Sequence, residues 1–101
     1  MIELGGSIEL VGFNEIDSSE MIVLKKIIGN YARKFSDNLK EDYEKLTLTL
    51  KKVHGKKSSK YELQAKLMVK GNPVNSDVTE NNLFVALAEV LKKVESQIIK
   101  K

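Results

Sequence analysis

The strongest pattern in the chain is YELQAKLMV at residues 61–69, in which every second residue from Tyr61 to Val69 is apolar. Alternation with a period of two predicts a β-strand that is buried on one face only. LTLTL at residues 46–50 repeats the pattern, with leucines on one face and threonines on the other. Because the second face of both strands is polar, we expect helices on one face of the sheet only, with the other face open to water or to a partner.

Two amphipathic helices flank these strands in the sequence. Apolar residues spaced by three and four from Met21 to Phe35 predict a first helix, with Asp17 as its N-cap and an end near residues 36–38. The same spacing from Leu83 to Ile98 predicts a closing helix, for which Thr79 is the candidate N-cap.

The remaining segments complete the order of elements. Residues 7–13 predict a first strand, residues 71–73 a turn, and residues 74–78 a short last strand. Residues 39–45 are predicted to be a polar connection, and residues 51–60 a hairpin loop. The order is therefore β-α-β-β-β-α, an α+β fold in which a four-stranded sheet packs with two helices on one face. Strands two to four should form a meander, and the first strand should lie parallel to a neighbour because a helix follows it.

Composition limits the possible classes of protein. The 101 residues are 42% hydrophobic and 31% charged, which is ordinary for one globular domain, so residues 1–101 are expected to be a single domain. No apolar run is long enough to cross a membrane, and no signal peptide is expected. The chain has no cysteine, so disulfides and thiolate metal sites are excluded, and a reducing compartment such as the cytoplasm fits.

Positive charge is concentrated in the second half of the chain. Residues 1–50 hold six basic and nine acidic side chains, whereas residues 51–101 hold eleven lysines and five acids. This asymmetry favours an anionic partner. Arg33 is the only arginine, so bidentate hydrogen bonds from guanidinium groups to bases are hardly available. Lysine contacts with phosphate are therefore the expected way of binding a nucleic acid.

Residues for catalysis are sparse. His54 is the only histidine, and it lies in the lysine-rich loop. The carboxylate pairs Asp42–Glu44 and Asp37–Glu41 fit charged loop surface better than an acid–base site. No glycine-rich phosphate motif occurs. We therefore expect no enzymatic activity, no catalytic residues, no metal and no cofactor.

Two basic clusters are candidates for binding an anion. The loop lysines could grip phosphates, or they could simply keep a hairpin tip soluble. The second cluster would form one basic surface if the two helices lie side by side, and its alternative interpretation is a solvated helix face. The loop lysines are Lys51, Lys52, Lys56, Lys57 and Lys60. The helical candidates for RNA binding are Arg33, Lys34, Lys92, Lys93 and Lys100.

The last third of the chain resembles the ribosome hibernation-promoting factor family, which includes ribosome-associated inhibitor A. The resemblance lies in residues 68–71, 81–87 and 90–98, similar to the family's final strand pair, turn and helix. In the final helix of the family, an aromatic-Ala-Ala-Ile segment precedes a Leu-x-x-Lys-Leu-x-x-Gln-Leu segment. The matching residues are Phe84, Ala86, Leu87, Lys93, Val94, Gln97 and Ile98. Asn81, Asn82, Ser96 and Ala88 depart from the pattern at positions where the family carries acidic or basic residues.

The resemblance implies a cytoplasmic, non-enzymatic stress-response protein that binds the small ribosomal subunit and its ribosomal RNA. Family members occupy the channel for messenger and transfer RNA, which blocks initiation and preserves idle ribosomes. Lys93 carries over most directly, Lys92 and Lys100 less so, and Arg33 with Lys34 match the basic first helix. Because the chain has no long C-terminal extension, a short form is expected.

A second hypothesis is a protein-interaction module that forms a homodimer through the open sheet face or an exposed strand edge. Thr47, Thr49, Gln64 and Met68 would lie on that face. A double-stranded-RNA-binding domain is a further alternative, although it would need fewer strands before its final helix.

Overall fold

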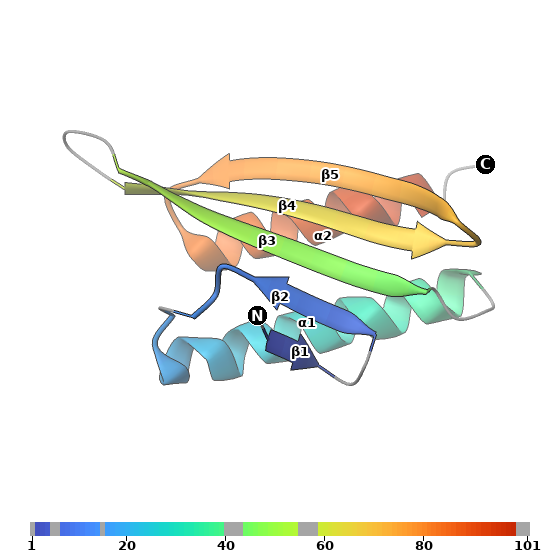
Figure 1. The fold of residues 1–101 in the computed structure, drawn as a ribbon, viewed down its shortest axis with the longest axis horizontal. Coiled ribbons are helices and arrows are strands. Elements are labelled where there is room, and N and C mark those ends of the chain that lie inside the picture. Colours follow the sequence, from blue (N-terminus) through green and yellow to red (C-terminus); the bar gives the residue numbers. More distant parts are fainter. Residues whose placement is uncertain (1, 5–6, 15, 40–43, 55–58, 99–101) are drawn as a thin grey trace.

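One mixed sheet organises the computed structural model of the protein, which describes residues 2–4, 7–14, 16–39, 44–54 and 59–98. The elements in chain order are β1 (Ile2–Leu4), β2 (Ile8–Val11), α1 (Ser18–Leu39), β3 (Lys45–His54), β4 (Ser59–Val69), β5 (Asn72–Glu80) and α2 (Leu83–Ile98). The predicted α+β class and the order β-α-β-β-β-α are confirmed. The three-residue β1, which the sequence patterns did not predict, adds a short strand to one edge of the sheet (Figure 1).

The strands lie side by side in chain order, from β1 to β5. β2 and β3 are parallel, with Leu10 opposite Leu48, because α1 carries the chain back to the start of the next strand. All other neighbouring pairs are antiparallel, so β3, β4 and β5 form the predicted meander. An ion pair between Lys45 and Glu9, 3.0 Å long, also links β2 and β3.

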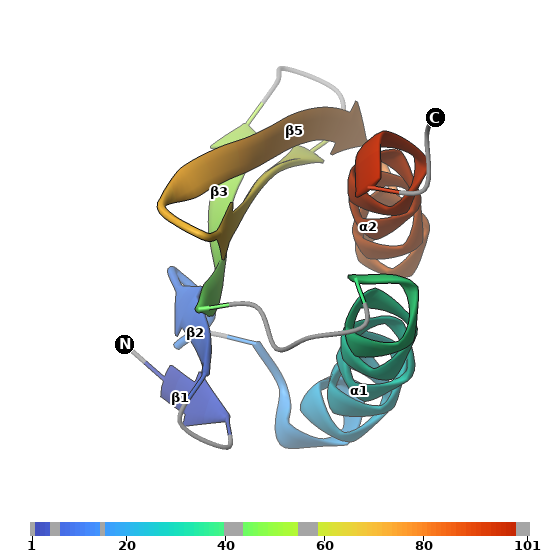
Figure 2. The ribbon, with the colours of Figure 1, turned by 90° about the vertical axis from the view of Figure 1, so that its right-hand side faces the viewer.

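Both helices pack on the same face of the sheet, as Figure 2 shows. They are in contact with each other and run in the same direction, so their C-terminal ends lie at the same end of the molecule (Figures 1 and 2). The core lies between the layers, where alternate residues of the strands meet the apolar stripes of the helices. The fully buried side chains include Leu10, Phe13, Leu24, Ile28, Phe35, Leu46, Leu48, Leu63, Leu67, Leu87, Val90 and Leu91.

The start of α2 differs from the prediction. Thr79 is not its N-cap but belongs to β5, where it lies opposite Glu62 of β4. The cap is Asn82, whose side-chain oxygen accepts hydrogen bonds from the backbone N–H groups of Phe84 (2.9 Å) and Val85 (3.1 Å). β5 continues to Glu80 because β4 supplies a backbone partner along its whole length, which outweighs the weak strand propensity of its polar residues.

The strands β3 and β4 also extend further than predicted. Residues 51–54 and 59–60 were expected to be loop, yet they continue the antiparallel ladder, with Lys51 opposite Glu62 and Lys52 opposite Tyr61. Pairing of two long neighbouring strands therefore overrides the local loop composition, and residues 55–58 of the predicted loop lie outside the described residues. At the start of α1, Asp17 occupies the predicted N-cap position, and its carboxylate accepts a hydrogen bond from the Ser19 hydroxyl.

Candidate nucleic-acid interface

The helix layer brings the predicted basic residues to one end of the molecule. Arg33 and Lys34 are exposed in the last third of α1, and Lys92 and Lys93 are exposed in the second half of α2. Because the helices are in contact and run in the same direction (Figures 1 and 2), both pairs lie in the halves of the two helices that lead to the same end of the layer. Lys100 lies outside the described residues.

Lys34 is held by an aromatic side chain of its own helix. Its ammonium nitrogen lies 4.8 Å from the centre of the Tyr31 ring, a cation–π geometry. Tyr31 is half-buried against the core, and its ring centre is 6.1 Å from that of Phe35, a fully buried residue. The core therefore orients Tyr31, and Tyr31 holds the charge of Lys34 near the helix surface.

Lys93 has a different environment from Lys92. Its ammonium group donates a hydrogen bond of 3.2 Å to the backbone carbonyl of Asp77, and the Gln97 amide donates one of 2.7 Å to the carbonyl of Asn75. Both carbonyls belong to β5, the strand at the edge of the sheet. The two matches to the family motif thus hold α2 against an edge strand. Lys92 has no such bond from its side chain and is the freer cation of the pair.

These hydrogen bonds also protect the β5 edge. Alternate residues of a strand direct their backbone groups to the same side, so Pro73 shares its side with Asn75 and Asp77. Pro73 has no N–H to offer, and the carbonyls of Asn75 and Asp77 are already occupied. An edge strand with free backbone groups invites pairing with another chain, and three positions of this edge, the two engaged carbonyls and the proline nitrogen, cannot take part in such pairing.

We predict that Lys93→Ala together with Gln97→Ala will cause self-association that increases with concentration. The substitutions free two edge carbonyls for strand pairing and remove two hydrogen bonds, which should lower the free energy of unfolding by about 1 kcal/mol. Sedimentation velocity over a range of concentrations measures the association. The matched control is Lys92→Ala with Ser96→Ala, which have the same spacing on the same helix. Equal masses for both variants at all concentrations would contradict a protective role.

Two carboxyl groups next to the basic pair were missed by the sequence patterns. A hydrogen bond with the Glu80 side chain raises the pKa of Glu89 above its ordinary value of 4.5, helped by desolvation and by the charge of Glu80. Lys93 and Lys92 act in the opposite direction. Glu80 and Glu89 are nine residues apart, in different elements, so only the packing of α2 against β5 brings them together.

We predict that Glu89→Gln will raise the melting temperature at pH 7, and that this gain will shrink as the pH falls toward 4.5. A carboxyl group whose pKa is raised in the folded state stabilises the fold while protonated, and this contribution is lost as the pH rises through the raised pKa. Thermal unfolding of both proteins at several pH values tests this, with Glu95→Gln on the same helix as the control. A gain that does not change with pH would show that Glu80 does not perturb Glu89.

The second basic cluster is only partly described. Lys51, Lys52 and Lys60 are exposed on the paired ends of β3 and β4, whereas Lys56 and Lys57 lie outside the described residues. The ammonium group of Lys52 lies 5.9 Å from the centre of the Tyr61 ring.

Candidate catalytic groups do not come together in the described part of the chain. No three His, Asp or Glu side chains within it lie close enough to hold a metal ion. Asp42, Glu41 and the side chain of His54 lie outside the described residues. None of the helices that the structure describes combines the length and apolar character needed to cross a membrane.

Comparison with known proteins identifies the fold. No family model matches the sequence, and no curated protein matches it significantly. The N-terminal domain of protein Y from Thermus thermophilus aligns with a TM-score of 0.56 at 18% identity, covering 92% of this chain and 93% of that domain. A ribosomal subunit interface protein from Coxiella burnetii aligns with a TM-score of 0.62 at 14% identity, covering 93% of this chain and 92% of that protein. The chain therefore has the fold of these two proteins, and the fold that the family resemblance implies is confirmed.

Proposed function

We propose that this protein is a ribosome hibernation factor. It binds ribosomal RNA of the small subunit through the basic end of its helix layer and inhibits translation by occupying the channel for messenger and transfer RNA. The observation that carries the proposal is the shared placement of Arg33, Lys34 and Lys92, which come from two helices and are all exposed. A protein with this function acts in the cytoplasm, where ribosomes are found.

The chemistry of this basic end favours contact with the RNA backbone. Within the described residues, Arg33, Lys34 and Lys92 form no ion pair with an acidic side chain, so their charges are available to phosphates. Lysine provides a point charge without the bidentate geometry that reads a base, and it can therefore contact phosphates in any sequence. The name of one similar structure, a ribosomal subunit interface protein, supports a ribosomal partner.

The direct test is cosedimentation of the protein with purified small subunits at two salt concentrations. Neutralising phosphates releases condensed counterions, so three contacts should lower the affinity by about 40-fold between 50 and 200 mM monovalent salt. Large subunits and free transfer RNA serve as competing anions of similar charge density. Absence of binding at the lower salt concentration, or equal binding to all three, would overturn the proposal.

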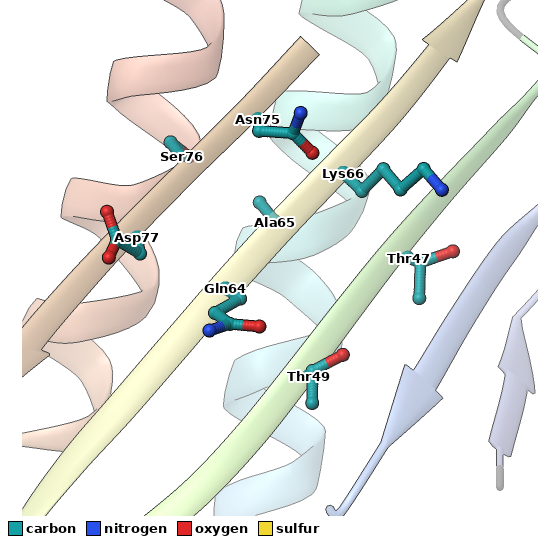
Figure 3. Close-up of a pocket in the computed structure, with 8 residues that line it drawn as sticks. All are labelled: Thr47, Thr49, Gln64, Ala65, Lys66, Asn75, Ser76 and Asp77. Atoms are coloured by element: carbon teal, nitrogen blue, oxygen red, sulfur yellow. The ribbon is translucent and has the colours of Figure 1, made fainter. Parts of the chain in front are cut away.

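A protein-interaction module that pairs through the open sheet face or an exposed strand edge is the second candidate. Lys93 and Gln97 engage two backbone carbonyls of β5, which disfavours pairing at that edge. The β1 edge and the open sheet face remain, the latter with Thr47, Thr49 and Gln64 on the side away from the helices, as Figure 3 shows. A dimer that forms without any affinity for ribosomes would favour this candidate over the first.

A further inference from the structure

The open face of the sheet carries two rows of polar side chains. One row crosses the strands through Thr47, Lys66 and Asn75, which lie opposite one another on β3, β4 and β5. The neighbouring row crosses through Thr49, Gln64 and Asp77 in the same way. Together they line a hollow with a volume of about 410 Å³ on the side of the sheet away from both helices (Figure 3).

The side chains of these two rows are available to a ligand. Lys66, Gln64, Asn75 and Asp77 are exposed, and the two threonines are half-buried. Among the hydrogen bonds and ion pairs of the described residues, none involves a side-chain atom of these six residues; only the backbone carbonyls of Asn75 and Asp77 are engaged. The hollow therefore presents hydroxyl, amide, ammonium and carboxylate groups that no hydrogen bond or ion pair within the described residues uses.

The two charges of the hollow lie on different strands and do not form an ion pair. Lys66 extends over β3 toward the side of Thr47, whereas Asp77 stays on β5 (Figure 3). Since neighbouring strands are about 4.8 Å apart, the Lys66 ammonium group over β3 and the Asp77 carboxylate on β5 are separated by about 10 Å. A ligand that satisfies both sides must have an anionic group at one end and hydrogen-bond donors at the other.

We propose that this hollow binds one nucleotide whose base carries an amino group. The phosphate lies against Lys66 and Thr47, the ribose hydroxyls lie between the rows, and the amino group donates to Asp77 with Gln64 beside it. One nucleotide is about as long as the separation of about 10 Å between the two charges. The volume of the hollow, about 410 Å³, lies within the usual range of about 300–1,000 Å³ for small-ligand sites. None of the residues that line the hollow is aromatic, so recognition depends on the edge of the base.

This chemistry predicts a preference among bases. Cytosine, adenine and guanine present amino donors, which a carboxylate accepts, whereas uracil presents a carbonyl oxygen at the position of the cytosine amino group. The nucleotide has two possible sources, a free mononucleotide or one unit of a single-stranded RNA. The RNA source rests on the function proposed above, and the free nucleotide does not.

The test is a titration of the full chain, labelled with ¹⁵N, with CMP, GMP, AMP and UMP and separately with short single-stranded RNAs, followed by NMR. We expect shifts of backbone amides on β3, β4 and β5, with UMP binding at least about tenfold more weakly than CMP. Lys66→Gln should weaken binding of every nucleotide about tenfold, and Asp77→Asn should remove the discrimination against uracil. Lys25→Gln on α1, which makes the same change in charge in the other layer, should have no effect.

Each outcome of this titration decides the proposal. Shifts with free nucleotides or with RNA alone both support the site and identify its source. No shift with either ligand, equal binding of UMP and CMP, or shifts confined to α1 and α2 would overturn it. The two proposals fail separately, because substitutions at Arg33, Lys34 and Lys92 should abolish ribosome binding while leaving the shifts with free nucleotides intact.

Discussion

Replacing Arg33, Lys34 and Lys92 together by glutamate is expected to lower the affinity for small ribosomal subunits by at least about 100-fold. Losing three charge-assisted contacts of about 1 kcal/mol each should raise the dissociation constant by roughly 100-fold, and the introduced carboxylates add repulsion from phosphate. The three residues are exposed, and the hydrogen bonds described here do not use their charged groups. The fold should therefore survive, as circular dichroism and thermal unfolding can verify.

Lys93 is deliberately left unchanged in this variant. It holds the β5 carbonyl of Asp77, so its replacement would mix a loss of RNA contact with a loose sheet edge. The control reverses Lys25 and Lys26, which are exposed in the first half of α1, away from the basic end of the helix layer. Cosedimentation of both variants at the lower salt concentration compares them directly. If both variants lose the same affinity, net charge alone controls binding and the helical site is wrong.

Gly12→Ala is expected to destabilise the fold by about 3 kcal/mol. Gly12 has a φ of +84°, a conformation that costs an L-residue about 1–2 kcal/mol. A Cβ atom at this position would also collide with the backbone carbonyl oxygen of Leu50 on β3, which cannot rotate away as a side chain could. Relieving such an overlap typically costs a further 1–3 kcal/mol. This sum is a large fraction of the 5–15 kcal/mol that stabilises an ordinary domain.

The matched control is Gly29→Ala, in the middle of α1. Gly29 is exposed, has helical geometry, and a Cβ added there would meet no atom within 4 Å. Alanine at this position should therefore raise the free energy of unfolding by about 1 kcal/mol through its higher helix propensity. Urea unfolding of both variants gives the two values. Equal effects of the two substitutions would show that the backbone at Gly12 requires neither a positive φ nor the close approach to the Leu50 carbonyl.

The fold was largely predictable because its elements depend on local patterns. The alternation in residues 61–69 and 46–50 identified both central strands and the polar outer face, since side chains of a strand alternate between its faces regardless of the neighbours. The parallel pairing of β2 with β3 followed from the helix between them. The end of β5 was not predictable, because residues 79–80 become strand only through their pairing with β4.

The candidate site was predictable in its residue types but not in its arrangement. The sequence indicated that Lys92 and Lys93 are exposed on one helix, and the structure confirms this exposure. It could not indicate that Lys93 reaches Asp77, that Glu89 meets Glu80, or that Tyr31 holds Lys34 in a set geometry. The first two contacts join α2 to β5, and their partners are 16 and nine residues apart in the chain.

By itself, the sequence determined the helices, the central strands, the position of the core and the excess of positive charge in the second half of the chain. These properties follow from the spacing of apolar residues and from composition, which act over a few neighbouring residues. Only the tertiary structure decided which lysines are free and which are engaged. Availability of a charged group depends on the partners that packing brings within hydrogen-bond distance, and this distance carries no signature in the sequence. The net charge of +3 therefore identifies no binding site until Arg33, Lys34 and Lys92 are seen at one end of the helix layer and Lys93 against the sheet.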